Sequence, residues 1–335
     1  MSGEAKRVEE NGPAVSSKDR PADRDGTVHD EFLQDQLVKT SRTFALAIPL
    51  LPQPTAREVT VSYLLFRIAD TFEDASVLWQ RPQQIAALDQ FVELLQEPSV
   101  EKAQQLAAGW LADPPTDHGG YLELLGNTPR VFEAYLEFSP TAREIIERHT
   151  IRTAQGMASV VERTDDGVLR LADIQDLRDY CYIVAGIVGE LLTDLFILDS
   201  AALAPVAEHL TERAALFGEG LQLVNILKDS SSDSTEGRNY LPAAAERSEV
   251  FALARQDLRA AAEYTLAVQK AGGPDGVVLF TGLPLELAWA TLDRVERDGP
   301  GAKLSRPEVF RIHNRLTAAV KGGRPAVVIR SSSGV

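Results

Sequence analysis

The stretch that decides the fold of this chain is Tyr63-Leu-Leu-Phe-Arg67-Ile-Ala-Asp70-Thr-Phe-Glu73-Asp74. Its apolar residues recur every three or four positions with no glycine or proline between them, which predicts an α-helix. At 3.6 residues per turn, Tyr63, Arg67 and Asp70 fall near one stripe of that helix. Asp74 continues the stripe, with Glu73 beside it. Three carboxylates are therefore predicted to project from one face of a helix that is otherwise apolar.

These acids admit two interpretations. A buried carboxylate without a partner costs several kcal/mol, so the acids either face water or hold cations. Solvated pairs of acids are frequent on helix surfaces in a chain with 49 Asp and Glu residues. The first stretch alone leaves both interpretations open, because a single motif match carries a false-positive risk.

A second stretch also combines an apolar helix with a polar stripe. It reads Gly220-Leu-Gln222-Leu-Val-Asn225-Ile-Leu-Lys228-Asp229-Ser-Ser-Ser-Asp233 and runs on to Gly237-Arg238-Asn-Tyr240-Leu-Pro242. The spacing i, i+3, i+7, i+11 places Gln222, Asn225, Asp229 and Asp233 on one stripe. A polar stripe on such a helix indicates a pocket rather than bulk water. Two such stripes facing each other would form a cavity with aspartates on both walls.

The two stretches resemble the acidic motifs of the squalene and phytoene synthase family, the head-to-head prenyl synthases. The family patterns are D-x-x-E-D after an arginine, and Q-x-x-N-I-x-[RK]-D-x-x-E-D followed by G-R-x-Y-L-P. Two further blocks fit: Ser41-Arg42-Thr43-Phe44 resembles S-R-x-F, and Tyr180-Cys-Tyr182-Ile-Val-Ala185-Gly186-Ile-Val-Gly189 resembles Y-C-x-x-V-A-G-x-V-G. The four blocks occur in the family order over roughly residues 30 to 320, which makes the resemblance specific.

The resemblance implies a Mg²⁺-dependent condensation of two prenyl diphosphates through a cyclopropyl diphosphate. Asp70, Glu73 and Asp74 would hold Mg²⁺ on one diphosphate, and Asp229 and Asp233 would face them across the cavity. Tyr180 aligns with a family tyrosine that lies near the departing proton and diphosphate. Formation of squalene would additionally require hydride from NADPH.

The resemblance also implies a set of substrate-binding residues beside these catalytic and metal-binding ones. Arginine and lysine side chains in the set would donate hydrogen bonds to phosphate oxygens. The implied substrate-binding residues are Ser41, Arg42, Tyr63, Arg67, Gln222, Asn225, Lys228 and Arg238.

Three functions fit the motifs, and we favour the first. It is a squalene synthase acting on farnesyl diphosphate, because the Tyr180 block and the Asn225 to Asp229 block look closest to bacterial squalene synthases. The alternative is a phytoene or dehydrosqualene synthase or a related prenyltransferase, since prenyl chain length depends on how deep the packing makes the tunnel. A second alternative is a family relative without catalysis that serves as an assembly factor, and the intact aspartates argue against it.

The rest of the chain is predicted to form one all-α domain, an isoprenoid-synthase-type helical bundle around a central cavity, over residues 29–320. Helical segments are expected over 85–95, 131–138 and 142–161, and no period-two alternation is long enough for a sheet. Residues 1–28 are rich in Glu, Lys, Asp, Pro and Ser and are predicted to be disordered. Residues 321–335 are predicted to be a flexible tail.

Charge and composition narrow the partners and the location. The net charge of −15 argues against nucleic acid as a partner. A diphosphate substrate remains compatible with that charge if divalent cations bridge it to the acidic walls. The lone cysteine, Cys181, fits a reducing compartment. We expect a cytoplasmic monomer or weak dimer whose membrane contact, if any, is peripheral, because Glu190 and Asp194 interrupt the long apolar run over 180–198.

One departure from the family pattern leads to a prediction. Ser232 stands where the second motif has a glutamate, so one negative charge is missing near the implied cation. Because charge count is a main determinant of affinity for a hard cation, Ser232→Glu should lower the Mg²⁺ concentration for half-maximal rate a few-fold, or about 1 kcal/mol. The control, Ser232→Gln, matches the size of glutamate without its charge and should not reproduce the gain. An unchanged Mg²⁺ titration of the rate in folded Ser232→Glu would mean that position 232 does not reach the metal.

Overall fold

The computed structural model describes residues 24–41, 43–164, 169–235 and 240–330. For residues 24–29 and 231–235 it describes the backbone alone. Within these ranges the chain is helical and contains no β-strand. The elements in chain order are α1 (Arg24–Thr40), α2 (Phe44–Ala47), η1 (Ile48–Leu50), α3 (Thr55–Glu73), η2 (Asp74–Val77), α4 (Arg81–Gln96), α5 (Val100–Ala112), α6 (Gly119–Gly126), α7 (Thr128–Leu136), α8 (Pro140–Glu162), α9 (Ile174–Cys181), η3 (Tyr182–Gly186), α10 (Ile187–Asp199), η4 (Ala201–Val206), α11 (Ala207–Thr235), α12 (Arg247–Lys270), α13 (Asp275–Asp298) and α14 (Arg306–Lys321).

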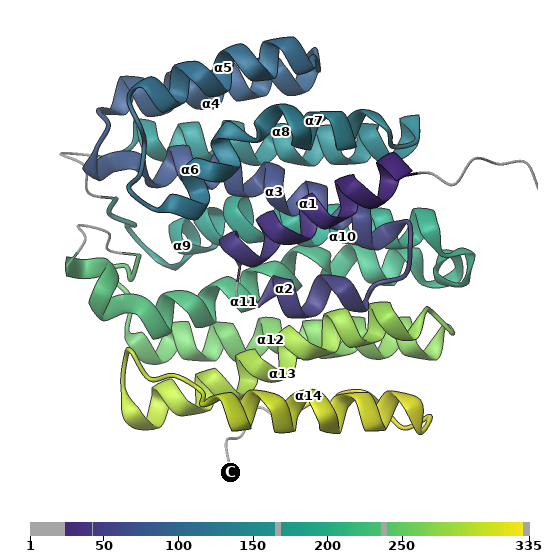
Figure 1. Cartoon of the computed structure of the whole chain (residues 1–335). Helices are drawn as coiled ribbons and strands as arrows, with labels where there is room; N and C mark the ends of the chain where they lie inside the picture. The colour runs from purple at the N-terminus through teal and green to yellow at the C-terminus, as the bar shows by residue number, and fades with distance from the viewer. Residues whose placement is uncertain (1–23, 42, 165–168, 236–239, 331–335) are drawn as a thin grey trace, which may run out of the picture.

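Figure 1 shows the helices stacked in one bundle, from α4 and α5 at the top of the view to α14 at the bottom. The two predicted motif helices are α3 and α11, which lie in the middle of this stack (Figure 1). The expected helices over 85–95, 131–138 and 142–161 are found in α4, α7 and α8. The predicted all-α fold with a single bundle is therefore confirmed.

The long apolar run is one continuous helical stretch with a π-helical segment in its middle, η3, between α9 and α10. Glycines on both sides of the contact with α11 allow close packing. A Cβ atom on Gly189 would lie 2.0 Å from the Ala214 carbonyl oxygen, and one on Gly218 would lie 2.0 Å from the Ala185 carbonyl oxygen. Helix α11 therefore packs backbone against backbone on η3 and α10.

Two helical stretches, Ile174–Asp199 and Asp275–Asp298, are long and apolar enough to span a membrane by length and composition. Both also supply residues to the core, such as Leu195 and Leu285, which are fully buried. Core helices of soluble proteins have the same length and composition, so these stretches are weak evidence for a membrane span.

The structure describes part of each of the two predicted terminal segments, 1–28 and 321–335. Helix α1 begins at Arg24, inside the segment 1–28 that the composition predicts to be disordered. Residues 1–23 lie outside the described part of the chain. Within the predicted flexible tail over 321–335, Ala326 and Val327 are buried, whereas Val328 and Ile329 are exposed. The Gln269 amide nitrogen donates to the Arg324 carbonyl oxygen at 2.8 Å and fixes this segment on α12.

The close contact of α10 with α11 makes a testable prediction. Gly189→Ala forces a methyl group onto the Ala214 carbonyl, so we expect the free energy of unfolding to fall by about 1–3 kcal/mol in urea denaturation. The control is Gly109→Ala in α5, where nothing lies within 4 Å of the added carbon. It should be neutral or gain up to about 1 kcal/mol from helix propensity. Equal stabilities of the two variants would contradict the tight packing.

Candidate active site

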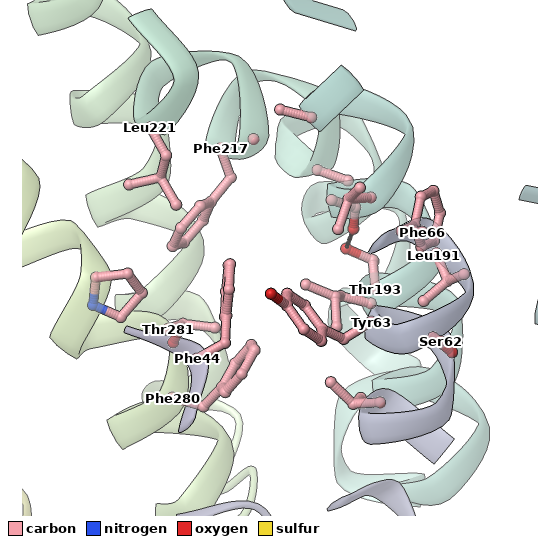
Figure 2. A pocket seen from close by; sticks show the side chains of 18 of the residues that line it. Phe44, Ser62, Tyr63, Phe66, Leu191, Thr193, Phe217, Leu221, Phe280 and Thr281 are labelled. Atoms are coloured by element: carbon pink, nitrogen blue, oxygen red, sulfur yellow. Dashed lines mark hydrogen bonds between the residues drawn. The ribbon is translucent and has the colours of Figure 1, made fainter. Parts of the chain in front are cut away.

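A cavity of about 270 Å³ lies between α3 on one side and α10 and α11 on the other, with α2, α12 and α13 completing the wall. Figure 2 shows the rings of Phe44, Tyr63 and Phe217 pointing into a common space. The Phe44 and Tyr63 rings are 5.5 Å apart between centroids. Most of the wall is apolar, and its lining residues include Phe66, Val188, Leu192, Phe196, Leu221 and Phe280.

The polar lining comes largely from the two predicted stripes. Helix α3 contributes Arg67 and Asp70, and helix α11 contributes Gln222 and Asn225. The expectation that the two stripes share one cavity therefore holds for these four residues. Asp74 and Asp229, which continue the stripes, do not line this cavity among the described residues.

Arg67 is held in place by neighbouring side chains. Its Nη1 lies 3.2 Å from Asp70 Oδ2, and its Nε donates to the Tyr63 hydroxyl at 3.3 Å. The guanidinium also lies over the Tyr121 ring, 5.2 Å from the centroid. Tyr63 in turn donates to the Thr40 carbonyl oxygen at 2.8 Å, which fixes the phenol that Arg67 uses. The guanidinium is thus pre-oriented at the cavity.

Asp70 carries a negative charge that Arg67 compensates only in part. Burial raises the pKa of Asp70 to about 6, and Asp74 adds to the rise while Arg67 opposes it. A carboxyl group with such a pKa gains from an additional positive charge, because a cation would restore the ordinary preference for the ionised form. This property fits a cation-binding role for Asp70.

Asp70 lines the apolar cavity, whereas Glu73 and Asp74 do not line it among the described residues; that the three acids hold Mg²⁺ together stays a prediction. Helix α3 ends at Glu73, and the chain turns into the 3₁₀ segment η2 at Asp74. Glu73 and Asp74 instead line a small hollow of about 30 Å³ together with Gln84 and Tyr240. Asp74 also lines a second hollow of about 260 Å³ on the other side of Arg67. Asp74 nevertheless lies close enough to Asp70 for its charge to raise the pKa of Asp70.

Tyr180 lies near Glu73 and Asp74 of the first motif and does not line the apolar cavity. It is buried, with 4% of its surface exposed, and stacks on Tyr240 at 4.9 Å between ring centroids. Burial raises its pKa well above 10, and the charge of Glu73 and the neighbouring Tyr240 add to the rise. The phenol therefore stays protonated and can only act as a hydrogen-bond donor or as a neutral acceptor.

The remaining predicted residues fall into two groups. The Ser41 hydroxyl accepts from the Phe44 backbone nitrogen at 3.0 Å, so it supports the start of α2 and does not line the cavity. The Nζ of Lys228 lies 3.0 Å from the Oδ2 of Asp229, so the two side chains form an ion pair. Arg42, Arg238 and the side chain of Asp233 lie outside the described residues.

The described part of the chain includes the side chains of four of the five predicted metal ligands, since the side chain of Asp233 lies outside it. No group of three or more His, Cys, Asp or Glu side chains in that part could hold a metal ion. Mg²⁺ in proteins often uses only one or two carboxylates and completes its shell with water and phosphate oxygens. The described carboxylates are therefore compatible with a metal site that needs substrate phosphate to form.

Several cavity residues were not predicted from the sequence. Phe217 and Phe280 line the wall, and the Thr193 hydroxyl bonds the Tyr264 hydroxyl at 2.9 Å between α10 and α12 (Figure 2). Thr193 and Tyr264 are both almost fully buried. Phe44 belongs to the recognised Ser41 to Phe44 block. Thr193, Phe217, Tyr264 and Phe280 lie outside the four recognised blocks, so no motif marked them.

The fold and the cavity thus define a helical protein with an apolar pocket that carries charged and amide groups on facing helices. The family model for squalene/phytoene synthase matches residues 37–247, which is more than half of the chain. The chain therefore belongs to the squalene/phytoene synthase family.

Relatives of known sequence and structure agree with this membership. Squalene synthase ERG9 of Candida albicans is 29% identical over 203 residues, covering 61% of this chain and 43% of that protein. Squalene synthase BSS of Botryococcus braunii is 33% identical over 208 residues, covering 61% of this chain and 41% of the relative. The matches thus span less than half the length of these two curated relatives.

Solved structures show the same fold. TcSQS in complex with E5700 matches with a TM-score of 0.71 at 24% identity, over 88% of this chain and 90% of that chain. A dehydrosqualene synthase in complex with ligand matches with a TM-score of 0.59 at 20% identity, over 89% of this chain and 99% of the other. At these identities the structural likeness concerns the fold.

Proposed function

We propose that this protein condenses two prenyl diphosphates head to head, with farnesyl diphosphate as the favoured substrate and squalene as the favoured product. The observation that carries the proposal is the cavity, whose long apolar wall has Arg67, Asp70, Gln222 and Asn225 among its polar lining residues. A prenyl diphosphate has matching chemistry, since an apolar chain is attached to an anionic head. Family membership supports the same reaction class.

The chain's own residues have separate tasks in this proposal. Arg67 donates hydrogen bonds to diphosphate oxygens, and its contacts to Tyr63 and Asp70 keep its donors oriented before substrate arrives. The amides of Gln222 and Asn225 bind the head group from the opposite wall. The apolar wall excludes water, which would otherwise quench an allylic carbocation.

Mg²⁺ is the proposed cofactor, with NADPH as reductant when squalene is the product. Asp70, Glu73 and Asp74 on one side, and Asp229 and Asp233 on the other, would hold Mg²⁺, which when bound would neutralise the departing diphosphate. The raised pKa of Asp70 supports this assignment. Tyr180, close to Glu73 and kept protonated by burial, would donate a hydrogen bond at this end of the site.

The direct test is incubation of the pure protein with the C15 or C20 diphosphate, Mg²⁺ and NADPH, followed by identification of the lipid. Asp70→Asn and Asp229→Asn should each abolish turnover while the circular dichroism of the helices stays unchanged. The reason is that each substitution removes a charge with little change of volume. The control is Asp89→Asn on the exposed side of α4, which should keep the wild-type rate. Near wild-type activity of either motif variant at saturating Mg²⁺ would refute the two-wall site.

The reductant separates the favoured product from its alternatives. Without NADPH, a squalene synthase should stop before squalene and leave the cyclopropyl diphosphate or dehydrogenated and hydroxylated products, because the final cation receives no hydride. Comparison of extracted lipids with and without NADPH measures this. Equal yields of one hydrocarbon under both conditions would instead identify a phytoene or dehydrosqualene synthase. A complete lack of turnover with either substrate would favour the non-catalytic alternative.

A further inference from the structure

A second group of ionisable side chains lies outside the cavity, where α9, α11 and α12 meet. Arg178 of α9 donates from Nη2 to Glu219 Oε2 of α11 at 3.1 Å. Glu219 is 5% exposed, and Asp257 of α12 is completely buried. Within the described residues, neither carboxyl oxygen of Asp257 has a hydrogen-bond partner. These three residues, named here the α9–α11–α12 cluster, take no part in the chemistry proposed above.

The charges in this cluster do not balance if every group is ionised. Arg178 donates its hydrogen bond to Glu219, so an ionised Asp257 would be a buried carboxylate without a hydrogen-bond donor among the described residues, which is strongly unfavourable. A proton on Asp257 removes the excess and leaves Glu219 paired with Arg178. Burial raises the pKa of Asp257 from 3.8 to about 7, while Arg178 and Arg259 oppose the rise and Glu219 adds to it. Cys181 also adjoins the two carboxyl groups, and burial raises its pKa, so its thiol stays neutral.

The cluster sits next to two parts of the proposed site. Arg178 precedes Tyr180 by two residues on α9, and Glu219 precedes Gln222 by about one turn of α11. The intervening Gly220 packs tightly on α12, since a Cβ there would lie 3.0 Å from the Asp257 Cβ. At this level, helix α11 is therefore held by two contacts. Its backbone packs closely on α12 at Gly220, and the Arg178–Glu219 pair links it to α9.

We propose that Arg178, Glu219 and Asp257 are positioning residues that fix α9 and α11 at the cavity, with Asp257 in its protonated form. This inference rests on the proposed function and deepens it. When Asp257 ionises, its charge competes with Glu219 for Arg178 and weakens the link between the helices that carry Tyr180 and Gln222. The positioning is therefore intact at low pH and is lost as the pH rises above about 7.

The first test uses kcat as a function of pH. Asp257→Asn imitates the protonated acid, so the ratio of its kcat to that of the wild type should be near one at about pH 6 and should rise about threefold or more by about pH 8.5. Glu219→Gln removes the ion pair at every pH and should lower kcat about tenfold with a smaller change in KM. The matched control is Glu58→Gln in α3, another buried carboxyl group whose pKa burial raises to about 7. Its kcat ratio to the wild type should stay flat with pH.

The second test does not depend on prenyl chemistry. Hydrogen exchange of amides in α9 and in residues 218–225 of α11 should be faster in Glu219→Gln than in the wild type, and unchanged there in Glu58→Gln. The melting temperature of Asp257→Asn relative to the wild type should increase from about pH 5 to about pH 8. The reason is that the raised pKa of Asp257 makes the wild type lose stability as pH rises through this window.

Each result decides one of the two proposals. A wild type without turnover overturns the proposed function, and the hydrogen-exchange and melting results then still decide whether the cluster holds the helices. A turning-over wild type with a flat Asp257→Asn ratio overturns the positioning role. If Glu219→Gln does not fold, the Asp257→Asn measurements decide alone.

Discussion

Helix α11 packs so closely on η3 and α10 that neither Gly189 nor Gly218 has room for a methyl group. This contact sets the separation of the helices on one side of the cavity. Since Val188 and Leu192 of α10 and Leu221 and Gln222 of α11 line the same space, the cavity's shape follows from that separation. The geometry of the cavity thus depends on a contact between small residues.

Buried carboxyl groups are a recurring feature of this acidic chain. Asp70, Glu58, Glu219 and Asp257 all have pKa values raised by burial. Their surroundings differ, however. Asp70 lines the cavity, whereas Asp257 of α12 is completely buried and lines no described cavity, and the charges of Arg178 and Arg259 only partly oppose the rise of its pKa. The same cost of burying a carboxylate is thus the basis of two different proposals: cation binding at Asp70 and helix positioning at Asp257.

The polar end of the site has two layers. Arg67 and Asp70 reach the cavity, while Glu73 and Asp74 meet Tyr240 in a hollow below, beside the buried Tyr180. Arg67 borders both the cavity and the hollow on its other side, so it links the apolar space to the later acids of the motif. In the proposed function, a head group bound at Arg67 would lie between the two layers and within reach of both sets of acids.

The sequence by itself determined the helical class, the family and the two motif helices, because helical periodicity and the spacing of Arg67, Asp70, Gln222 and Asn225 are local properties. Only the tertiary structure decided which hollow each acid lines: Asp70 lines the apolar cavity, whereas Glu73 and Asp74 line neighbouring hollows. The packed segment at Val327 and the cluster around Asp257 were equally unpredictable. Burial and charge pairing arise between helices distant in the sequence, and no local pattern encodes them.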